Sequence, residues 1–108
     1  MSSQNIIEYP KFLIAIPQFL HLLVRLLTDE PSEMIEWSGG QINIYKPNEL
    51  AAILQRYYRH SNLSSFHRQL SNYGFRKNLH EREFICFVND QTSKDIDSIL
   101  KLKVITTI

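Results

Sequence analysis

Apolar residues recur at steps of three and four in three parts of the chain, which is the spacing of helices that bury one face. The first part begins at Pro17, which suits a first helical turn because its missing N–H costs nothing there, and should end near Thr28. The second is short and begins at Asn48, a residue that can cap a helix. The third follows Ser61-Asn62 and ends at Gly74, a typical C-terminal capping glycine. The predicted apolar stripes are Phe19, Leu20, Leu23 and Leu27 (or Leu26) in the first helix, Leu50, Ile53 and Leu54 in the second, and Leu63, Phe66, Leu70 and Tyr73 in the third.

Two pairs of short strands are expected beside these helices. The first pair is joined by Ser38-Gly39-Gly40, a glycine turn of hairpin type, and the second pair follows the third helix and is hinged at 80–82. A last amphipathic segment, 93–102, can close the domain as a helix. The expected strands are 34–37, 41–45, 75–79 and 83–88. This order predicts an α+β domain of the winged helix-turn-helix type, with a three-helix core, a small four-stranded antiparallel sheet and the last hairpin as the wing.

The face of the third helix opposite its apolar stripe carries one arginine, Arg68, among small polar residues. A guanidinium can donate two parallel hydrogen bonds to O6 and N7 of guanine, and small neighbours let a helix sink deeply into the major groove. Gln69 lies toward the flank and could contact adenine or a phosphate. The polar residues that share the face of Arg68 are Ser61, Ser64, Ser65, Ser71 and Asn72. The pattern predicts a helix that reads double-stranded DNA.

Charge is unevenly distributed along the chain, although the net charge is only +1. Residues 55–82 hold six Lys/Arg and one acid, a charge of +5, whereas the remainder has six basic and ten acidic residues, a charge of −4. Such polarity is typical of a polyanion binder with one working face, although on charge alone a solvated basic face remains an alternative. Contacts to the DNA backbone are expected around Arg68. The candidates are Arg59, His60 and Asn62 before the third helix, and Tyr73, Arg76 and Lys77 at its end.

The central motif carries a family resemblance. It consists of His60-Ser61-Asn62-Leu63-Ser64-Ser65-Phe66, Arg68-Gln69-Leu70 and Tyr73-Gly74-Phe75-Arg76-Lys77, and it resembles the DNA-binding domain of heat-shock transcription factors. The flanking runs that are also similar to this family are Ile16-Pro17-Gln18-Phe19-Leu20, Ile35-Glu36-Trp37-Ser38, Glu83-Phe84 and Cys86-Phe87. The resemblance therefore covers about residues 16–103.

The resemblance implies a transcription regulator of the stress response that resides in the nucleus and binds GAA-type elements in double-stranded DNA. It places Arg68 on guanine and implies phosphate or shallow base contacts from Arg59, Ser65, Tyr73 and Lys77. Heat-shock factors form trimers through a coiled coil after this domain, but only about sixteen residues remain from Ser93 onward, fewer than three to four heptads. The chain is either a fragment of a longer factor or a stand-alone short protein. A stand-alone protein should bind single elements weakly, and it could associate with other copies of itself only through its surface or on DNA.

Three departures from the family pattern alter these expectations. Ser71-Asn72 replaces the usual Asn-Met pair, so an outer base contact is expected to change. His67 occupies a position that is normally apolar, and we expect it to form a hydrogen bond on the helix flank or to lie near a phosphate. The wing is short, with about three residues between its strands. It resembles the wing of ETS domains, so His80 and Arg82 at its tip could contact phosphate, the alternative being a solvated turn.

Other kinds of chemistry find little support in the sequence. Cys86 lies in an apolar strand and is interpreted as a buried, inert thiol, and the four histidines lack the spacing of a zinc site. The three glycines all serve turns, and no local signature of a catalytic triad is present. No apolar run approaches the about 20 residues that span a bilayer. We therefore expect no enzyme, cofactor, metal, small-molecule substrate or membrane partner.

The expected organisation is an N-terminal extension at 1–15, a winged-helix DNA-binding domain at 16–103 and a C-terminal tail at 104–108. A second hypothesis is a winged-helix module for protein–protein interaction that has lost DNA binding. The apolar tail supports that alternative, because it could pair as an edge strand. The basic polarity of residues 55–82 favours DNA.

Overall fold

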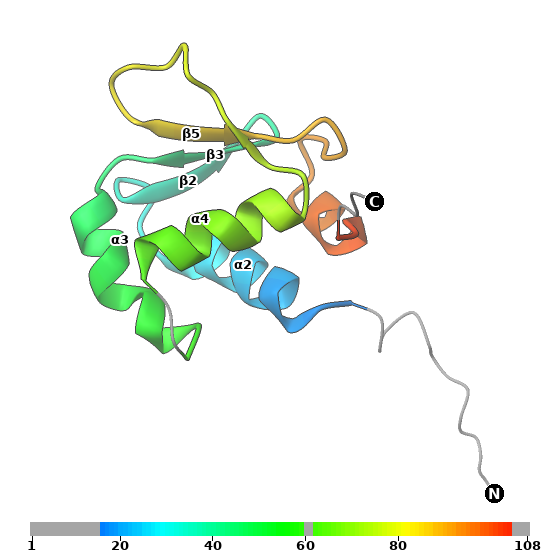
Figure 1. The fold of residues 1–108 in the computed structure, drawn as a ribbon, viewed down its shortest axis with the longest axis horizontal. Coiled ribbons are helices and arrows are strands. Elements are labelled where there is room, and N and C mark those ends of the chain that lie inside the picture. Colours follow the sequence, from blue (N-terminus) through cyan, green and yellow to red (C-terminus); the bar gives the residue numbers. More distant parts are fainter. Residues whose placement is uncertain (1–15, 60–61, 105–108) are drawn as a thin grey trace, which may run out of the picture.

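The computed structural model describes residues 16–59 and 62–104. The expected N-terminal extension, His60, Ser61 and residues 105–108 lie outside them. The helices and strands follow the predicted order, with one short 3₁₀ helix (η2) between two helices and another (η3) after the last strand (Figure 1). The elements are α2 (Gln18–Asp29), β2 (Ile35–Ser38), β3 (Gln41–Ile44), α3 (Pro47–Ile53), η2 (Leu54–Arg56), α4 (Leu63–Asn72), β4 (Arg76–Lys77), β5 (Ile85–Val88) and η3 (Ile96–Lys101).

The four strands form one antiparallel sheet in the order β2-β3-β5-β4. Gly39 and Gly40 adopt φ values of +60° and +88° in the turn between β2 and β3, which confirms the predicted glycine turn. In the centre of the sheet Ile42 of β3 is paired with Phe87 of β5. The edge strand β4 has only two residues, which pair with Val88 and Phe87. The mixed helix and antiparallel-sheet architecture confirms the predicted winged helix-turn-helix fold.

One hydrophobic core joins α2, α4 and the inner face of the sheet. The first helix contributes both Leu26 and Leu27, so the stripe predicted to use one of them uses both. In α4, Phe66 and Leu70 are buried and meet the core side of the sheet. The short η3 packs against α2 and buries Ile99. Because Phe66 and Leu70 are buried in this core, the opposite face of α4 points outward.

Two predicted helix starts were wrong. The second helix begins at Pro47 with Lys46 as its N-cap, and Asn48 makes no capping hydrogen bond. Proline has a fixed φ and no N–H to satisfy, so it initiates the helix one residue earlier. Pro17 precedes α2 as its N-cap, with φ −63° and ψ 144°, and does not lie in the first turn.

The closing segment is a 3₁₀ helix and is shorter than predicted. Asp95 accepts a hydrogen bond from the N–H of Asp97 at 3.0 Å, and the Ser98 hydroxyl donates to the carbonyl of Asp95 at 2.7 Å. Asp and Ser side chains that bond nearby backbone groups compete with the α-helical pattern. The segment is therefore held as a short turn of helix over Ile96–Lys101.

The wing is longer than predicted, because its strands are shorter. Seven residues, 78–84, connect β4 to β5, where about three were expected. The Asn78 side chain accepts the N–H of His80 at 3.0 Å, and the Glu81 carboxylate accepts the N–H of Glu83 at 3.1 Å. These local bonds take the backbone out of the sheet ladder, so the hinge predicted at 80–82 lies within a true loop.

Candidate nucleic-acid interface

The start of α4 is fixed by a reciprocal cap. The Asn62 Oδ1 accepts the backbone N–H of Ser65 at 2.8 Å, while the Ser65 Oγ accepts the backbone N–H of Asn62 at 3.0 Å. A cap of this kind is worth about 0.5–2 kcal/mol of helix stability. The Asn62 oxygen and the Ser65 hydroxyl, both predicted to contact DNA, therefore first serve to start the helix that carries Arg68.

The end of α4 is also sharply defined. Gly74 has φ +95°, its N–H donates to the carbonyl of Ser71 at 3.0 Å, and the N–H of Phe75 donates to the carbonyl of Leu70 at 3.1 Å. These bonds satisfy carbonyls that a helix end leaves free. The chain turns directly from α4 into β4, which brings Arg76 and Lys77 beside the end of the helix.

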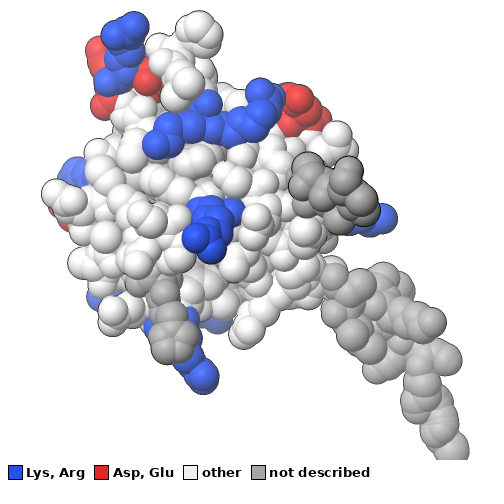
Figure 2. Space-filling model, viewed as in Figure 1, with Lys and Arg blue, Asp and Glu red and all other residues white. Residues whose placement is uncertain are grey.

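The outward face of α4 presents the predicted reader. Arg68 is exposed and shares this face with Ser64, Ser71 and Asn72, which are exposed as well, and Gln69 is exposed on the flank. No ion pair holds the Arg68 guanidinium within residues 16–59 and 62–104. Figure 2 shows Lys and Arg atoms gathered over the face on which α4 lies in front, with acidic atoms toward its margin. The structure thus brings an exposed guanidinium and small polar residues together on one basic face.

The phosphate-contact candidates differ in how available they are. Arg59 precedes α4 in the chain and Lys77 follows it, and both side chains are exposed. Arg76 is exposed, but its Nη2 lies 3.0 Å from Oδ1 of Asp90, so an ion pair already holds it. His60 lies outside the described residues. Binding through Arg76 would require this exposed, weak pair to open.

Tyr73 is a core residue. Its side chain is only 6% exposed, and its ring stacks on Phe19 with centroids 5.7 Å apart. Burial also raises the pKa of its hydroxyl. The sequence predicts Tyr73 both in the apolar stripe and among the phosphate contacts. Its burial supports the first role and leaves little of the ring to reach DNA.

His67 lies on the flank of α4 against the sheet. Its ring centroid is 4.9 Å from that of Phe87, and its Nε2 is buried without a hydrogen-bond partner in the described part of the chain. Burial lowers the pKa of His67, and the nearby charge of Lys77 lowers it further. The prediction that the His67 side chain forms a hydrogen bond is wrong for its Nε2. The imidazole instead packs against the sheet, as an apolar side chain would.

The wing carries charges of both signs. His80 and Arg82 are exposed near its tip, but Glu81 and Glu83 flank the arginine. The Phe84 ring lies 4.8 Å from that of Tyr45, which ties the loop to the end of β3. Leu79 is 78% exposed. Contact between Arg82 and phosphate remains a prediction, and the two glutamates would oppose it.

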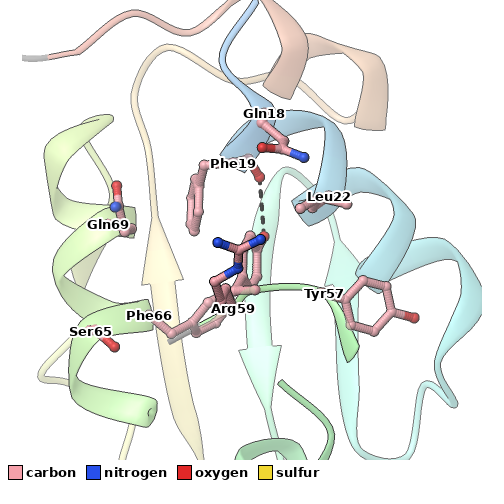
Figure 3. Close-up of a pocket in the computed structure, with 9 residues that line it drawn as sticks. Gln18, Phe19, Leu22, Tyr57, Arg59, Ser65, Phe66 and Gln69 are labelled. Carbon is pink, nitrogen blue, oxygen red and sulfur yellow. Dashed lines mark hydrogen bonds between the residues drawn. The ribbon is translucent and has the colours of Figure 1, made fainter. Parts of the chain in front are cut away.

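Gln18, at the start of α2, is not among the interface residues predicted from the sequence. It lines a cleft together with Arg59, Ser65 and Gln69, all of which were candidates. Figure 3 shows Gln18 on α2 and Gln69 on α4, with Arg59 between the two helices. No local pattern marks Gln18, because its position depends on how α2 packs against α4.

Neither a metal site nor a reactive thiol is found among the described residues. No group of three or more His, Cys, Asp or Glu side chains there could hold a metal ion. Cys86 is buried, and burial raises the pKa of its thiol. None of the helices in the described ranges is long and apolar enough to cross a membrane.

Comparisons with known proteins point to one family. A family model described as HSF-type DNA-binding matches residues 19–103. Heat shock factor protein 1 of Homo sapiens is 38% identical over 69 residues, which are 60% of this chain and 13% of that protein. Heat shock factor protein 2 of Gallus gallus is 42% identical over 69 residues, 60% of this chain and 12% of that protein. The chain thus spans a small part of these relatives.

Solved structures agree with the family match. The crystal structure of Chaetomium thermophilum Skn7 with SSRE DNA superposes with a TM-score of 0.69 at 26% identity, covering 82% of this chain and 99% of that one. A structure that contains the DNA-binding domain of the heat shock transcription factor with cognate DNA gives a TM-score of 0.63 at 30% identity, covering 70% and 96%.

Proposed function

Because this chain belongs to the HSF-type DNA-binding family, we propose that it binds double-stranded DNA sequence-specifically, with α4 in the major groove. The observation that carries the proposal is the exposed guanidinium of Arg68 on the basic face of α4, which forms no ion pair with any other residue that the structure describes. The Skn7 structure supports it, because that related domain was crystallised with DNA. We propose that the target is a GAA-type element.

The proposed contacts follow from exposure and chemistry. Arg68 donates to O6 and N7 of guanine, Asn72 is suited to adenine, and Gln69 on the flank can contact adenine or a phosphate. Ser64 and Ser71 keep the helix close to the base edges. Backbone contacts position this reader but carry no sequence information. The residues proposed to make them are Arg59, His60, Asn62, Ser65, Arg76, Lys77 and Arg82, with Tyr73 contributing only through packing.

The role of Arg68 is tested with Arg68→Ala in titrations against a GAA-repeat duplex and a scrambled duplex. We expect a loss of about 1–3 kcal/mol in discrimination at one base pair, because the bidentate contact to guanine disappears. Arg25→Ala is the control, since Arg25 is also exposed but lies on α2 in an ion pair with Asp29. Equal losses on both duplexes would show that Arg68 does not read a base.

We infer a role in transcription regulation, with residence in the nucleus, from the kind of protein in which this domain occurs. The curated relatives are heat shock factors and heat stress transcription factors. The family is a DNA-binding family and not an enzyme family. The domain is proposed to extend over residues 16–103, beginning slightly before the matched segment.

One observation favours the alternative of a protein-interaction module. Leu79 on the wing and Val104 near the end of the described chain are exposed apolar residues, at 78% and 55%. A mobility-shift assay at low salt with GAA-repeat duplexes separates the two hypotheses. Absence of any shift would favour the interaction module, whereas the basic face around α4 leads us to expect binding.

A further inference from the structure

A cleft of about 630 Å³ runs along the flank of α4, where the helix meets the start of α2 (Figure 3). Its apolar wall is an aromatic cluster in which the ring centroids of Phe19 and Tyr58 are 5.0 Å apart and those of Phe19 and Phe66 are 6.0 Å apart. The Tyr58 hydroxyl donates to the carbonyl of Phe19 at 3.1 Å. These contacts join α2 to the segment before α4, so the cleft has firmly packed walls.

The polar residues of the cleft suit an anion. Arg59 supplies a positive charge between Gln18 and Gln69, whose carboxamides can donate hydrogen bonds. No carboxylate is among the residues that line the cleft in the described structure. Within residues 16–59 and 62–104, the side chains of Gln18, Arg59 and Gln69 are exposed and make no hydrogen bond or ion pair. Three donors are therefore free to meet a ligand.

We propose that Gln18, together with Arg59 and Gln69, binds a backbone phosphate of DNA in this cleft. The inference rests on the proposed function and adds Gln18 to it. A helix about 10–12 Å wide fills a major groove about 12 Å wide, so the two phosphate backbones run along its two flanks. In Figure 1 the sheet lies on one side of α4 and the start of α2 on the other. Lys77 faces one backbone, and the cleft faces the second.

The main test is Gln18→Glu, which replaces a donor by an acidic group of the same shape. We expect the affinity to fall about 3- to 10-fold on both GAA-repeat and scrambled duplexes, because a hydrogen bond is replaced by repulsion. The variant should remain folded, since a carboxylate in the first turn of a helix is favourable and α2 has no acid there. Thermal unfolding of the variant checks this point.

Asn48→Asp is the matched control. Asn48 is exposed in the first turn of α3, so the substitution makes the same change from carboxamide to carboxylate in an equivalent place. We expect less than about a twofold change in affinity, because Asn48 is not among the residues that line the cleft and salt screens an exposed charge from a ligand that it does not contact. An effect of Gln18→Glu no larger than that of Asn48→Asp overturns the proposal.

A second pair of variants introduces a positive charge at the two positions where the first pair introduced a negative one. Gln18→Lys should steepen the dependence of log affinity on log salt by about 0.9, the value for one added phosphate contact, without changing base preference. Asn48→Lys should leave the slope unchanged. Equal slopes for the two variants contradict a phosphate at Gln18.

Duplexes with one neutral methylphosphonate locate the contact. At the phosphate held by the cleft, the neutral group should weaken wild-type binding and remove the difference between wild type and Gln18→Glu. A difference that persists at every position scanned overturns the proposal. Failure of the wild-type protein to bind any duplex would overturn the proposed function as well, whereas wild-type binding with an inert Gln18 overturns this inference alone.

Discussion

At the scale of single residues, His67 shows how a polar ring is used in packing. It sits one position before the proposed base reader Arg68, yet its ring contacts Phe87 and its Nε2 has no partner in the described structure. A buried polar atom without a partner costs free energy. The cost grows when the imidazole is protonated, because burial disfavours the charged form.

The pKa of His67 predicts a pH dependence of folding. Its folded pKa lies below the ordinary value of 6.5, so the unfolded chain binds more protons as the pH falls below that value. The free energy of unfolding should therefore decrease as the pH is lowered from 7.5 toward the folded pKa. His67→Leu should flatten this profile, whereas His21→Gln, a change at an exposed histidine of α2, should leave it unchanged. Denaturant titrations across this pH range measure it, and identical profiles for wild type and His67→Leu would contradict the prediction.

At the scale of elements, α4 and the wing differ in how they are held. The helix has a reciprocal cap at Asn62, a glycine at its end and a face in the core. The wing is a seven-residue loop stabilised by local side-chain bonds and by the contact of Phe84 with Tyr45. A helix held at both ends can present a base-reading side chain to DNA. This loop is suited at most to a contact with the DNA backbone.

Arg82→Ala tests whether the wing contacts DNA. If the guanidinium meets a phosphate, the salt slope should become shallower by about 0.9, with equal losses on specific and scrambled duplexes. The double change Glu81→Gln and Glu83→Gln should raise affinity, because two acids beside Arg82 are removed. Unchanged affinity and slope for Arg82→Ala would exclude the wing from the interface.

At the scale of the molecule, the basic charge of residues 55–82 is gathered on and around α4. The cations proposed to contact phosphate are Arg59, Arg76, Lys77 and Arg82, whereas Arg68 is proposed to contact guanine. Only Arg76 among them is in an ion pair within the described residues, with Asp90. The number of these cations that meet phosphate decides how steeply binding weakens with salt.

We expect log affinity to fall with log salt at a slope of about −3.6 if all four of these cations contact phosphate, since each contact contributes about 0.9. If Arg76 stays with Asp90, the slope should be nearer to about −2.7. Titrations between about 50 and 200 mM salt measure it. Asp90→Asn should release Arg76 and make the salt dependence steeper. A slope of log affinity against log salt near zero would contradict a polyanion-binding face.

Much of the fold could be predicted from the sequence because its signals are local. The helical spacing of Phe66, Leu70 and Tyr73, the cap at Asn62 and the glycines of the turns act within a few residues of one another. The exposed face of α4 with Arg68 follows from the same periodicity. The predictions of the strand ends and of the wing were less accurate. Local hydrogen bonds accepted by the Asn78 and Glu81 side chains replace the hydrogen bonds of the sheet ladder there.

By itself, the sequence determined the order of the elements, the buried stripe of α4 and the residues opposite that stripe. Only the tertiary structure decided that Arg76 is paired with Asp90, that His67 packs on Phe87 and that Gln18 lies across a cleft from Gln69. Each of these relationships joins residues that are 14 or more positions apart in the chain. They depend on how helices and sheet pack around one core, a geometry that no local periodicity encodes.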